Sequence, residues 1–393
     1  MLDTTQYQDF KRLFQKRLTR SRDKTRLVFR HEPVAFPPVL VNSAFYHLFG
    51  TDPDEIPAGI FDDPAVMTAW QERKYYDQIT HIDDDFVPYL LPWFGTTVLS
   101  SALGAEVFYN DNADPTFDCS RFAIQTARDI RNLRIADPER DGLMPKVLDY
   151  IRYMKRNSFL PIGITDCQGP LATANQLMGY DHLFFLMRDD PALAHELMDK
   201  VTESLIIWIK RQKAEIGEPL AFCFGDQQIY TGEHAGVWLA DDDAVLVGPE
   251  IYHEFAVPYN SRVLKAFGGG VLHYCGCANH QIDNFLATEG LVAINNYCLH
   301  GLQKAAELQK RIQGKMVLIL CDFAPRNYRD YFNELFRLLS PRGLIIDCQF
   351  SPVLSLTHDG KYDAERRDRI STCGDILAHI QTLIPTLARH TPR

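Results

Sequence analysis

The sequence contains no long hydrophobic run and no low-complexity tract. No segment approaches the roughly 18 apolar residues of a membrane span, and the N-terminal residues lack the basic-then-apolar order of a signal peptide. These absences predict a cytoplasmic protein without a membrane segment. The 393 residues, 46% hydrophobic and 23% charged, are sufficient for one large core or for two domains.

An excess of basic residues is also missing. The chain has 51 acidic and 41 basic residues, a formal net charge of -10, and the two kinds are interspersed. A nucleic-acid-binding protein usually carries a basic face, so this class is disfavoured. The nine cysteines, an odd number in a chain of cytosolic character, indicate free thiols rather than disulfides.

Short apolar runs alternate with segments of helix length from about residue 160 onward, which is typical of a parallel sheet covered on both faces. The expected strands are 160–166, 219–226, 270–275, 291–298, 316–322 and 343–350, with weaker ones near 34–41 and 86–91. The expected helices are 5–30, 63–79, 190–214, 248–267, 300–313, 327–339 and 373–387.

Eight β/α units predict an α/β fold of the (β/α)8 TIM-barrel type with an N-terminal helical extension. We expect residues 1–80 to form the extension, packed on a barrel of residues 81–393. An open doubly wound sheet is the alternative, but no Gly-x-Gly-x-x-Gly follows any early strand.

A histidine and a cysteine end the apolar run at 270–275. Residues i and i+2 of a strand point to the same face, so His273 and Cys275 present an imidazole and a thiol to one point. This pair is half of a zinc site, because Zn²⁺ prefers sulfur and imidazole ligands. A third ligand is therefore expected elsewhere in the chain.

Cysteines at the ends of the last three strands are candidates for that ligand. Cys298, Cys321 and Cys348 occupy similar positions, and spacing does not choose among them. Strand parity puts Cys348 on the opposite face from Asp347. For any one cysteine alone, a small buried residue is the commoner explanation. His300 and His358 are further nitrogen donors, although such histidines are more often exposed loop residues.

Two groups of carboxylates lie near the expected site. Asp226, at the end of the strand 219–226, is the candidate catalytic carboxylate, orienting His273 or filling a fourth metal position; capping the next helix is the alternative. The run 241–243 of three aspartates favours a solvated helix cap over a ligand set.

Several segments together resemble a known superfamily. They are 241–243, 247–255, 257–259 and 273–276, with Gly169-Pro170-Leu-Ala-Thr and 187–198 upstream. Over roughly residues 85–390 they are similar to the uroporphyrinogen decarboxylase superfamily, whose members are TIM barrels. The decarboxylases' Met-Arg-Gln-Ala-Gly-Arg motif is absent, and near Phe94 or Gly95, ahead of Ala102-Leu-Gly104, their aspartate is missing.

The chain resembles more closely the superfamily's corrinoid-dependent methyltransferase branch. The resemblance implies zinc held by His273, Cys275 and Cys348, although the text around Cys348 departs from the branch's Gly-Cys pattern. It also implies a corrinoid (cobalamin) on a separate protein, since no Asp-x-His-x-x-Gly motif occurs here. Homodimers are frequent in the superfamily.

The resemblance thus predicts a zinc-dependent methyltransferase that moves a methyl group between a small molecule and the corrinoid protein. Two alternatives stay open. One is a decarboxylase or other carbon-acid enzyme of the same superfamily, acting on a carboxylated substrate. The other is a non-catalytic barrel in which a fully protein-coordinated zinc stabilises the fold. Aromatic residues expected near the barrel mouth are Trp93, Tyr230, Tyr274 and Tyr297.

Overall fold

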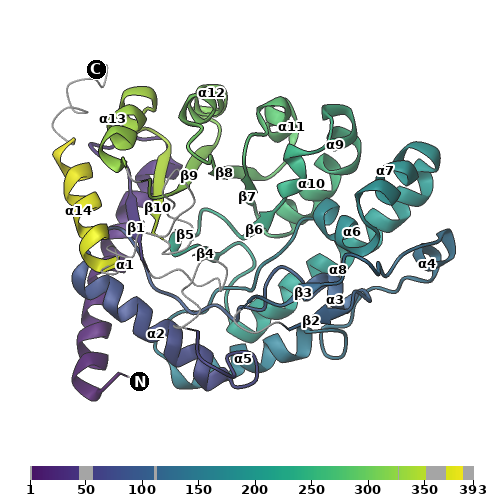
Figure 1. Cartoon of the computed structure of the whole chain (residues 1–393), viewed down its shortest axis with the longest axis horizontal. Coiled ribbons are helices and arrows are strands. Elements are labelled where there is room, and N and C mark those ends of the chain that lie inside the picture. Colours follow the sequence, from purple (N-terminus) through teal and green to yellow (C-terminus); the bar gives the residue numbers. More distant parts are fainter. Residues whose placement is uncertain (1, 44–55, 110–112, 326, 351–368, 384–393) are drawn as a thin grey trace.

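The computed structural model describes residues 2–43, 56–109, 113–325, 327–350 and 369–383. Its main sheet has six parallel strands in the order β1, β10, β9, β8, β7, β6. They are β1 (Val39–Asn42), β6 (Val237–Ala240), β7 (Gly270–Cys275), β8 (Leu291–Tyr297), β9 (Val317–Phe323) and β10 (Leu344–Gln349). Figure 1 shows them as an arc with helices on its outer side.

Two less regular segments close this arc into a ring. Segment 85–91 lies next to β1, and segment 161–169 lies between it and β6. The backbone bonds that join them are Asp85 N to Val39 O at 2.9 Å, Leu90 N to Pro161 O at 2.8 Å and Ala240 N to Cys167 O at 3.0 Å. The predicted α/β TIM barrel is confirmed, with six regular strands and two irregular ones.

Helices cover the outside of the barrel. They are α1 (Thr4–Phe29), α2 (Pro64–His81), α3 (Val98–Ala102), α4 (Ala127–Asn132), α5 (Met144–Asn157), α6 (Pro170–Met178), α7 (Tyr180–Asp189), α8 (Pro191–Ile216), α9 (Pro249–Phe255), α10 (Val257–Ala266), α11 (Ile282–Ala287), α12 (Leu302–Ile312), α13 (Tyr328–Leu338) and α14 (Arg369–Thr382). Short 3₁₀ turns, η2 (Asp242–Val245) and η3 (Asn279–Gln281), follow β6 and precede α11. Among the described residues no helix is both long and apolar enough to span a bilayer.

Most expected helices are present, but the expected helix 248–267 is two helices. Helix α9 ends at Phe255 and α10 begins at Val257, with Ala256 between them. Pro258 has no backbone N–H to continue the ladder of the preceding turn, and its ring crowds the carbonyl four residues earlier. The break therefore follows from one proline.

The expected barrel strand 219–226 is wrong. Within it, β4 (Cys223–Asp226) pairs only with β5 (Ile229–Gly232), antiparallel, as a hairpin. The barrel strand at this point of the chain is β6 instead. The hairpin connects α8 to β6, so it enters from the N-terminal end of the barrel, and Figure 1 shows it inside the arc of strands.

The turn of this hairpin carries no recognisable sequence signature. Gln227 and Gln228 both have positive φ, 53° and 60°, in a two-residue loop that normally contains Asn or Gly. Buried contacts hold this conformation. The Gln228 N–H donates to Tyr89 Oη at 3.1 Å, and its carbonyl accepts from Val87 N at 3.2 Å. Tertiary packing, not the local sequence, forms the turn.

Helix α1 is fixed to the barrel by buried charges. Arg17, 4% exposed, pairs with Asp84, which is 2% exposed. The Asp84 carboxylate also accepts from Val41 N at 2.9 Å, at the edge of β1. Lys24 pairs with Asp85 at 2.7 Å. These carboxylates therefore connect α1 to the first barrel strand.

The division into an extension of residues 1–80 and a barrel of residues 81–393 stays a prediction. Helix α1 packs against the barrel through the buried charges described above. However, β1 lies within the first segment and pairs with β10. The barrel therefore draws one strand from the first 80 residues.

Replacing Arg17 by alanine tests the ion pair with Asp84 that connects α1 to the barrel. The Arg17→Ala variant leaves the Asp84 carboxylate buried without its counter-ion, which should lower the free energy of unfolding by about 3–5 kcal/mol. The control is Arg12→Ala, because that arginine, whose side chain is 69% exposed, pairs with Asp9 on the surface. Urea unfolding measures the free energy of unfolding of both variants. Equal stabilities would contradict a stabilising role for the Arg17–Asp84 pair.

Candidate metal centre

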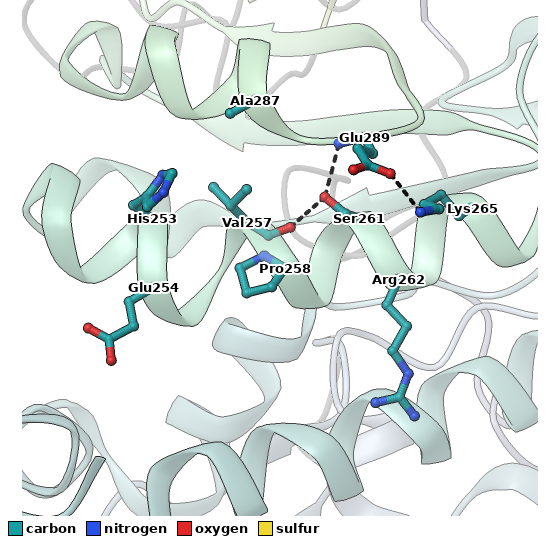
Figure 2. A pocket seen from close by; sticks show the side chains of 9 residues that line it. All are labelled: His253, Glu254, Val257, Pro258, Ser261, Arg262, Lys265, Ala287 and Glu289. Carbon is teal, nitrogen blue, oxygen red and sulfur yellow. Dashed lines mark hydrogen bonds and ion pairs between the residues drawn. The ribbon is translucent and has the colours of Figure 1, made fainter. Parts of the chain in front are cut away.

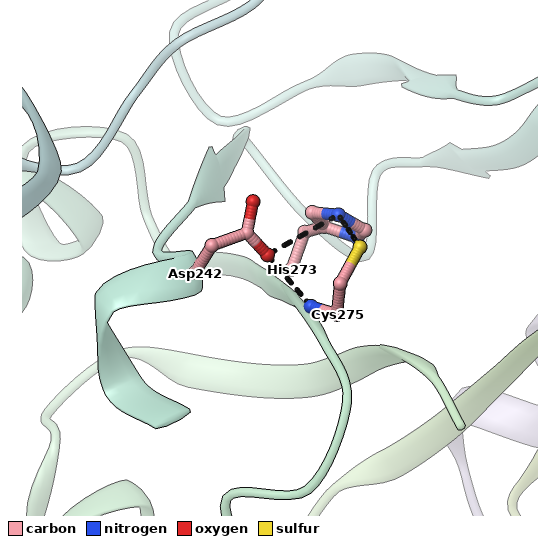
Figure 3. Close-up of side chains that lie close together, drawn as sticks. All are labelled: Asp242, His273 and Cys275. Atoms are coloured by element: carbon pink, nitrogen blue, oxygen red, sulfur yellow. Dashed lines mark hydrogen bonds and ion pairs between the residues drawn. The ribbon is translucent and has the colours of Figure 1, made fainter. Parts of the chain in front are cut away.

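Three side chains with metal-binding atoms meet at the C-terminal ends of β6 and β7 (Figure 3). Cys275 Sγ lies 3.6 Å from His273 Nε2, and a carboxylate oxygen of Asp242 lies 4.0 Å from the same nitrogen. Donor atoms of all three lie within 4.8 Å of one another, and the described part of the chain contains no other such group of three. His273 is half-buried and the other two are exposed, so the group sits at the barrel rim.

These separations match a tetrahedral zinc site. Zn–S of about 2.3 Å and Zn–N of about 2.0–2.1 Å, at the tetrahedral angle, put sulfur and nitrogen about 3.5–3.6 Å apart. The Cys275–His273 distance of 3.6 Å agrees. The corresponding nitrogen–oxygen separation is about 3.4 Å, so Asp242 at 4.0 Å reaches it by a small side-chain movement. The donor set therefore fits zinc.

Neighbouring strands bring Asp242 to the pair. Ala240 of β6 lies in register with His273, and Asp242 begins the turn η2 that follows. The Asp242 carboxylate accepts from Cys275 N at 2.6 Å, which fixes its direction. Desolvation, and then this carboxylate, raise the pKa of the Cys275 thiol. A cation at the site is thus needed to hold the thiolate.

The other two aspartates of the run are structural. Asp241 is fully buried, and its carboxylate accepts from Tyr252 Oη and Asn260 Nδ2, both at 2.8 Å. Asp243 is 3% exposed and accepts from Tyr180 Oη. The expectation of a solvated run is wrong for these two. Only Asp242 faces the histidine and the cysteine.

A buried asparagine orients the metal-binding histidine. Asn295 of β8 lies in register with His273, and its Oδ1 is 2.5 Å from His273 Nδ1. Asn295 Nδ2 donates to Cys321 Sγ at 2.9 Å, so the amide oxygen is the atom left to face the imidazole. Nδ1 therefore carries the proton and donates it, which leaves the Nε2 lone pair directed at Cys275.

The structure does not bring Cys348 to this pair. Asp347 points into the barrel, where its Oδ2 lies 3.5 Å from Cys321 Sγ, so its neighbour Cys348 points outward by strand alternation. Cys348 is 3% exposed. Burial raises the pKa of its thiol most, and the next cause is the nearby Cys373 of α14, a helix on the outside of the barrel. Among the described residues, Asp242 rather than Cys348 therefore lies beside the His273–Cys275 pair.

The remaining predicted donors also lie apart from the pair. Cys298 faces outward and donates to Asp322 Oδ2 at 3.1 Å. Cys321 faces inward but contacts Asn295 rather than the metal-binding atoms. His300 Nε2 lies 3.0 Å from Phe323 O. His358 is outside the described residues.

Asp226 lies at the tip of the inner hairpin rather than at the end of a barrel strand. Its Oδ1 accepts from Gln227 N at 2.7 Å, and its charge raises the pKa values of Asp166 and Asp347. The second ring nitrogen of His273 bonds to Asn295, so the orienting role considered for Asp226 belongs to the asparagine. Asp226 thus lies at the barrel interior on the side of its N-terminal end.

The comparisons with known proteins agree with this fold. Residues 90–218 match the family model for uroporphyrinogen decarboxylase. This match ends before β6, so it does not include Asp242, His273 or Cys275. The resemblance predicted from the sequence motifs is confirmed for the superfamily.

Curated relatives fall in both branches. A uroporphyrinogen decarboxylase of Syntrophotalea carbinolica is 26% identical over 207 residues, covering 50% of this chain and 53% of that one. A methylated-thiol–coenzyme M methyltransferase of Methanosarcina mazei is 28% identical over 143 residues, covering 35% and 34%. The chain spans about half the length, or less, of these relatives.

A solved structure extends the likeness to nearly the whole chain. A methyltransferase from Methanosarcina mazei superposes with a TM-score of 0.64, covering 92% of this chain and 98% of that one at 16% identity. At this identity the likeness concerns the fold alone. The two chains therefore share the fold over 92% of this chain.

Two residues of this group were not predicted as part of the site: the run 241–243 favoured a helix cap over a ligand set, and Asn295 lies in no recognised motif. Asp242 follows a four-residue strand, β6, which the expected strand 219–226 displaced. Asn295 stands in the apolar run of β8, two residues before Tyr297 and therefore on the same inward face. A polar residue on an inward face was the available signal in the second case.

An outer groove of about 680 Å³ is separate from this centre (Figure 2). It lies along α9 and α10 and is lined by residues such as His253, Val257 and Ser261. Its polar groups are already satisfied: Lys265 pairs with Glu289 at 2.6 Å, and Ser261 Oγ accepts from Glu289 N at 2.9 Å. The groove therefore offers no unpaired group for catalysis.

Removing the Asn295 amide should weaken metal binding. In Asn295→Ala the imidazole loses the acceptor that fixes its tautomer, and zinc affinity should fall about 10–100-fold. Competition with a coloured chelator measures this. Asn279→Ala is the matched control, since that amide bonds Lys304 O and Glu307 on the surface. Unchanged affinity in Asn295→Ala would remove the orienting role.

Proposed function

We propose that this protein is a zinc-dependent methyltransferase that moves a methyl group between a small molecule and a corrinoid carried by a separate protein. The observation that carries the proposal is the pair His273 Nε2 and Cys275 Sγ, 3.6 Å apart at the C-terminal rim of the barrel. Active sites of TIM barrels lie at this rim.

Each residue of the proposed site has a distinct role. His273, Cys275 and Asp242 would hold the metal, with Asn295 fixing the imidazole. Bound zinc with an open position deprotonates a thiol or acts as a Lewis acid on an ether or alcohol oxygen. Asp242 and Cys275 are exposed, so a substrate reaches them from the mouth. Tyr297 borders the site on the β8 side. Its ring centre lies 5.4 Å from that of His273.

A decarboxylase of the same superfamily is the second candidate. It is favoured by the family model and by curated relatives that are uroporphyrinogen decarboxylases. Against it, the aspartate expected near Phe94 or Gly95 is missing, and the arginine-rich motif is absent. A fully protein-coordinated structural zinc is less well supported, because three donors leave a fourth position open.

Zinc analysis of variants tests the metal centre. Wild type purified without chelator should contain about one zinc per chain, and His273→Ala and Cys275→Ser should lose it. Asp242→Asn should reduce zinc content, whereas Cys348→Ser should retain it because that thiol faces outward. Cys277→Ser is the control, since this exposed cysteine is outside the donor group.

The outcomes separate the ligand sets and the functions. Loss in Cys348→Ser with retention in Asp242→Asn would assign the third position to the cysteine. Protein that refuses added zinc would overturn the proposal. With zinc in place, demethylation of methylcobalamin in the presence of thiols supports a methyltransferase, and release of carbon dioxide from carboxylated substrates supports the decarboxylase.

A further inference from the structure

The interior of this barrel is unusually polar. TIM barrels are generally filled by branched apolar side chains. Here the inward positions include Asn295 of β8, Cys321 of β9 and Asp347 of β10. The tip of the β4–β5 hairpin adds Gln227 from the N-terminal end of the barrel. Hydrogen bonds link them: Cys321 Sγ lies 2.9 Å from Asn295 Nδ2, 3.3 Å from Gln227 Oε1 and 3.5 Å from Asp347 Oδ2. This layer continues directly from the metal-binding His273.

One carboxylate in this layer has an unused oxygen. Asp347 is 1% exposed, and its Oδ2 accepts from Gln349 Nε2 at 2.7 Å. Its Oδ1 is buried without a hydrogen-bond partner among the described residues. An ionised buried carboxylate is costly unless a positive charge or a donor meets it. Asp347 therefore indicates a ligand that supplies one.

The neighbouring charges are also negative. Asp166, on the segment before α6, feels the charges of Asp226 and Asp242, and Asp347 feels those of Asp226 and Asp84. Burial is the largest cause, and these acids add to it, raising the pKa of both Asp166 and Asp347 to about 7. The interior is therefore a region of negative potential that favours a cation over an anion.

The arrangement suits an organic cation better than a second metal ion. No three carboxylates, thiols or imidazoles of the described interior come within 4.8 Å of one another apart from the group at Asp242. One aromatic ring lies near these acids: Tyr297 feels the charges of Asp347 and Asp226. Its ring centre is 5.5 Å from that of Phe323. Dispersed carboxylates with aromatic faces are the surroundings in which quaternary ammonium groups bind.

We propose that the small molecule of the methyl-transfer reaction is an organic ammonium compound, whose positive charge lies in the barrel interior near Asp347 and Asp166. The methyl group would move between the corrinoid cobalt and a thiol or oxygen atom of this molecule at the zinc position, one Co–C bond exchanging with one S–C or O–C bond, so the ammonium group serves binding alone. This assignment rests on the proposed function, because it places the cation beside the layer that ends at His273. A polycarboxylate substrate would meet acids of the same sign.

Calorimetric titration of the zinc-loaded full chain tests the charge preference. Choline and its uncharged isostere 3,3-dimethylbutan-1-ol have nearly the same shape, so their comparison isolates the charge. Wild type should bind choline at least about tenfold more tightly than the isostere. In Asp347→Asn choline affinity should fall at least about tenfold, with binding of the isostere unchanged. Asp166→Asn is the second variant, in case the first does not fold.

The control is Asp283→Asn, because that side chain is 86% exposed on α11 and pairs with Arg311. Equal binding of choline and the isostere by wild type, or unchanged choline binding in folded Asp347→Asn and Asp166→Asn, would overturn the inference. The titration measures binding and needs no methyl transfer, so its result does not depend on the proposed function. A protein with normal zinc content and methyl transfer but no preference for choline would reject the ammonium substrate alone.

Discussion

Alternation of side chains along the parallel strands is the constraint on which the rest of this structure depends. On β7 it places His273 and Cys275 on the inner face and Tyr274 on the outer face, where its ring stacks on Phe285. On β10 it places Asp347 inside and Cys348 outside. The same rule thus assembles half of a metal site at one strand and removes the expected third ligand at another.

The inner hairpin changes what the barrel encloses. It enters from the end opposite the metal centre and brings Asp226 and Gln227 into the interior, where apolar side chains usually pack. Positive φ at two glutamines costs roughly 1–2 kcal/mol each, and contacts to Tyr89 and Val87 hold the turn in place. Strain kept in this way is found most often at functional sites. The hairpin therefore fills part of the barrel interior with polar side chains.

The charge of the interior bears on the choice between the two superfamily activities. A decarboxylase that acts on carboxylated substrates needs cationic side chains to hold them. The charges that act most on Asp166 and Asp347 come from other aspartates instead. An interior of this charge is more compatible with a neutral or cationic small molecule than with a carboxylated one. The outer helices, with their paired charges, contribute stability rather than chemistry.

The sequence by itself determined the alternation of strands and helices, and with it the barrel, because buried parallel strands leave short, nearly continuous apolar runs. It also determined the His273–Cys275 pair, since i and i+2 share a face in any strand. Only the tertiary structure decided the partners of that pair. Asp242 follows β6 and Asn295 belongs to β8, the strands on either side of β7, and their approach depends on the register between strands, which no local pattern encodes. The hairpin was decided in the same way, by buried contacts that select a turn its own residues disfavour.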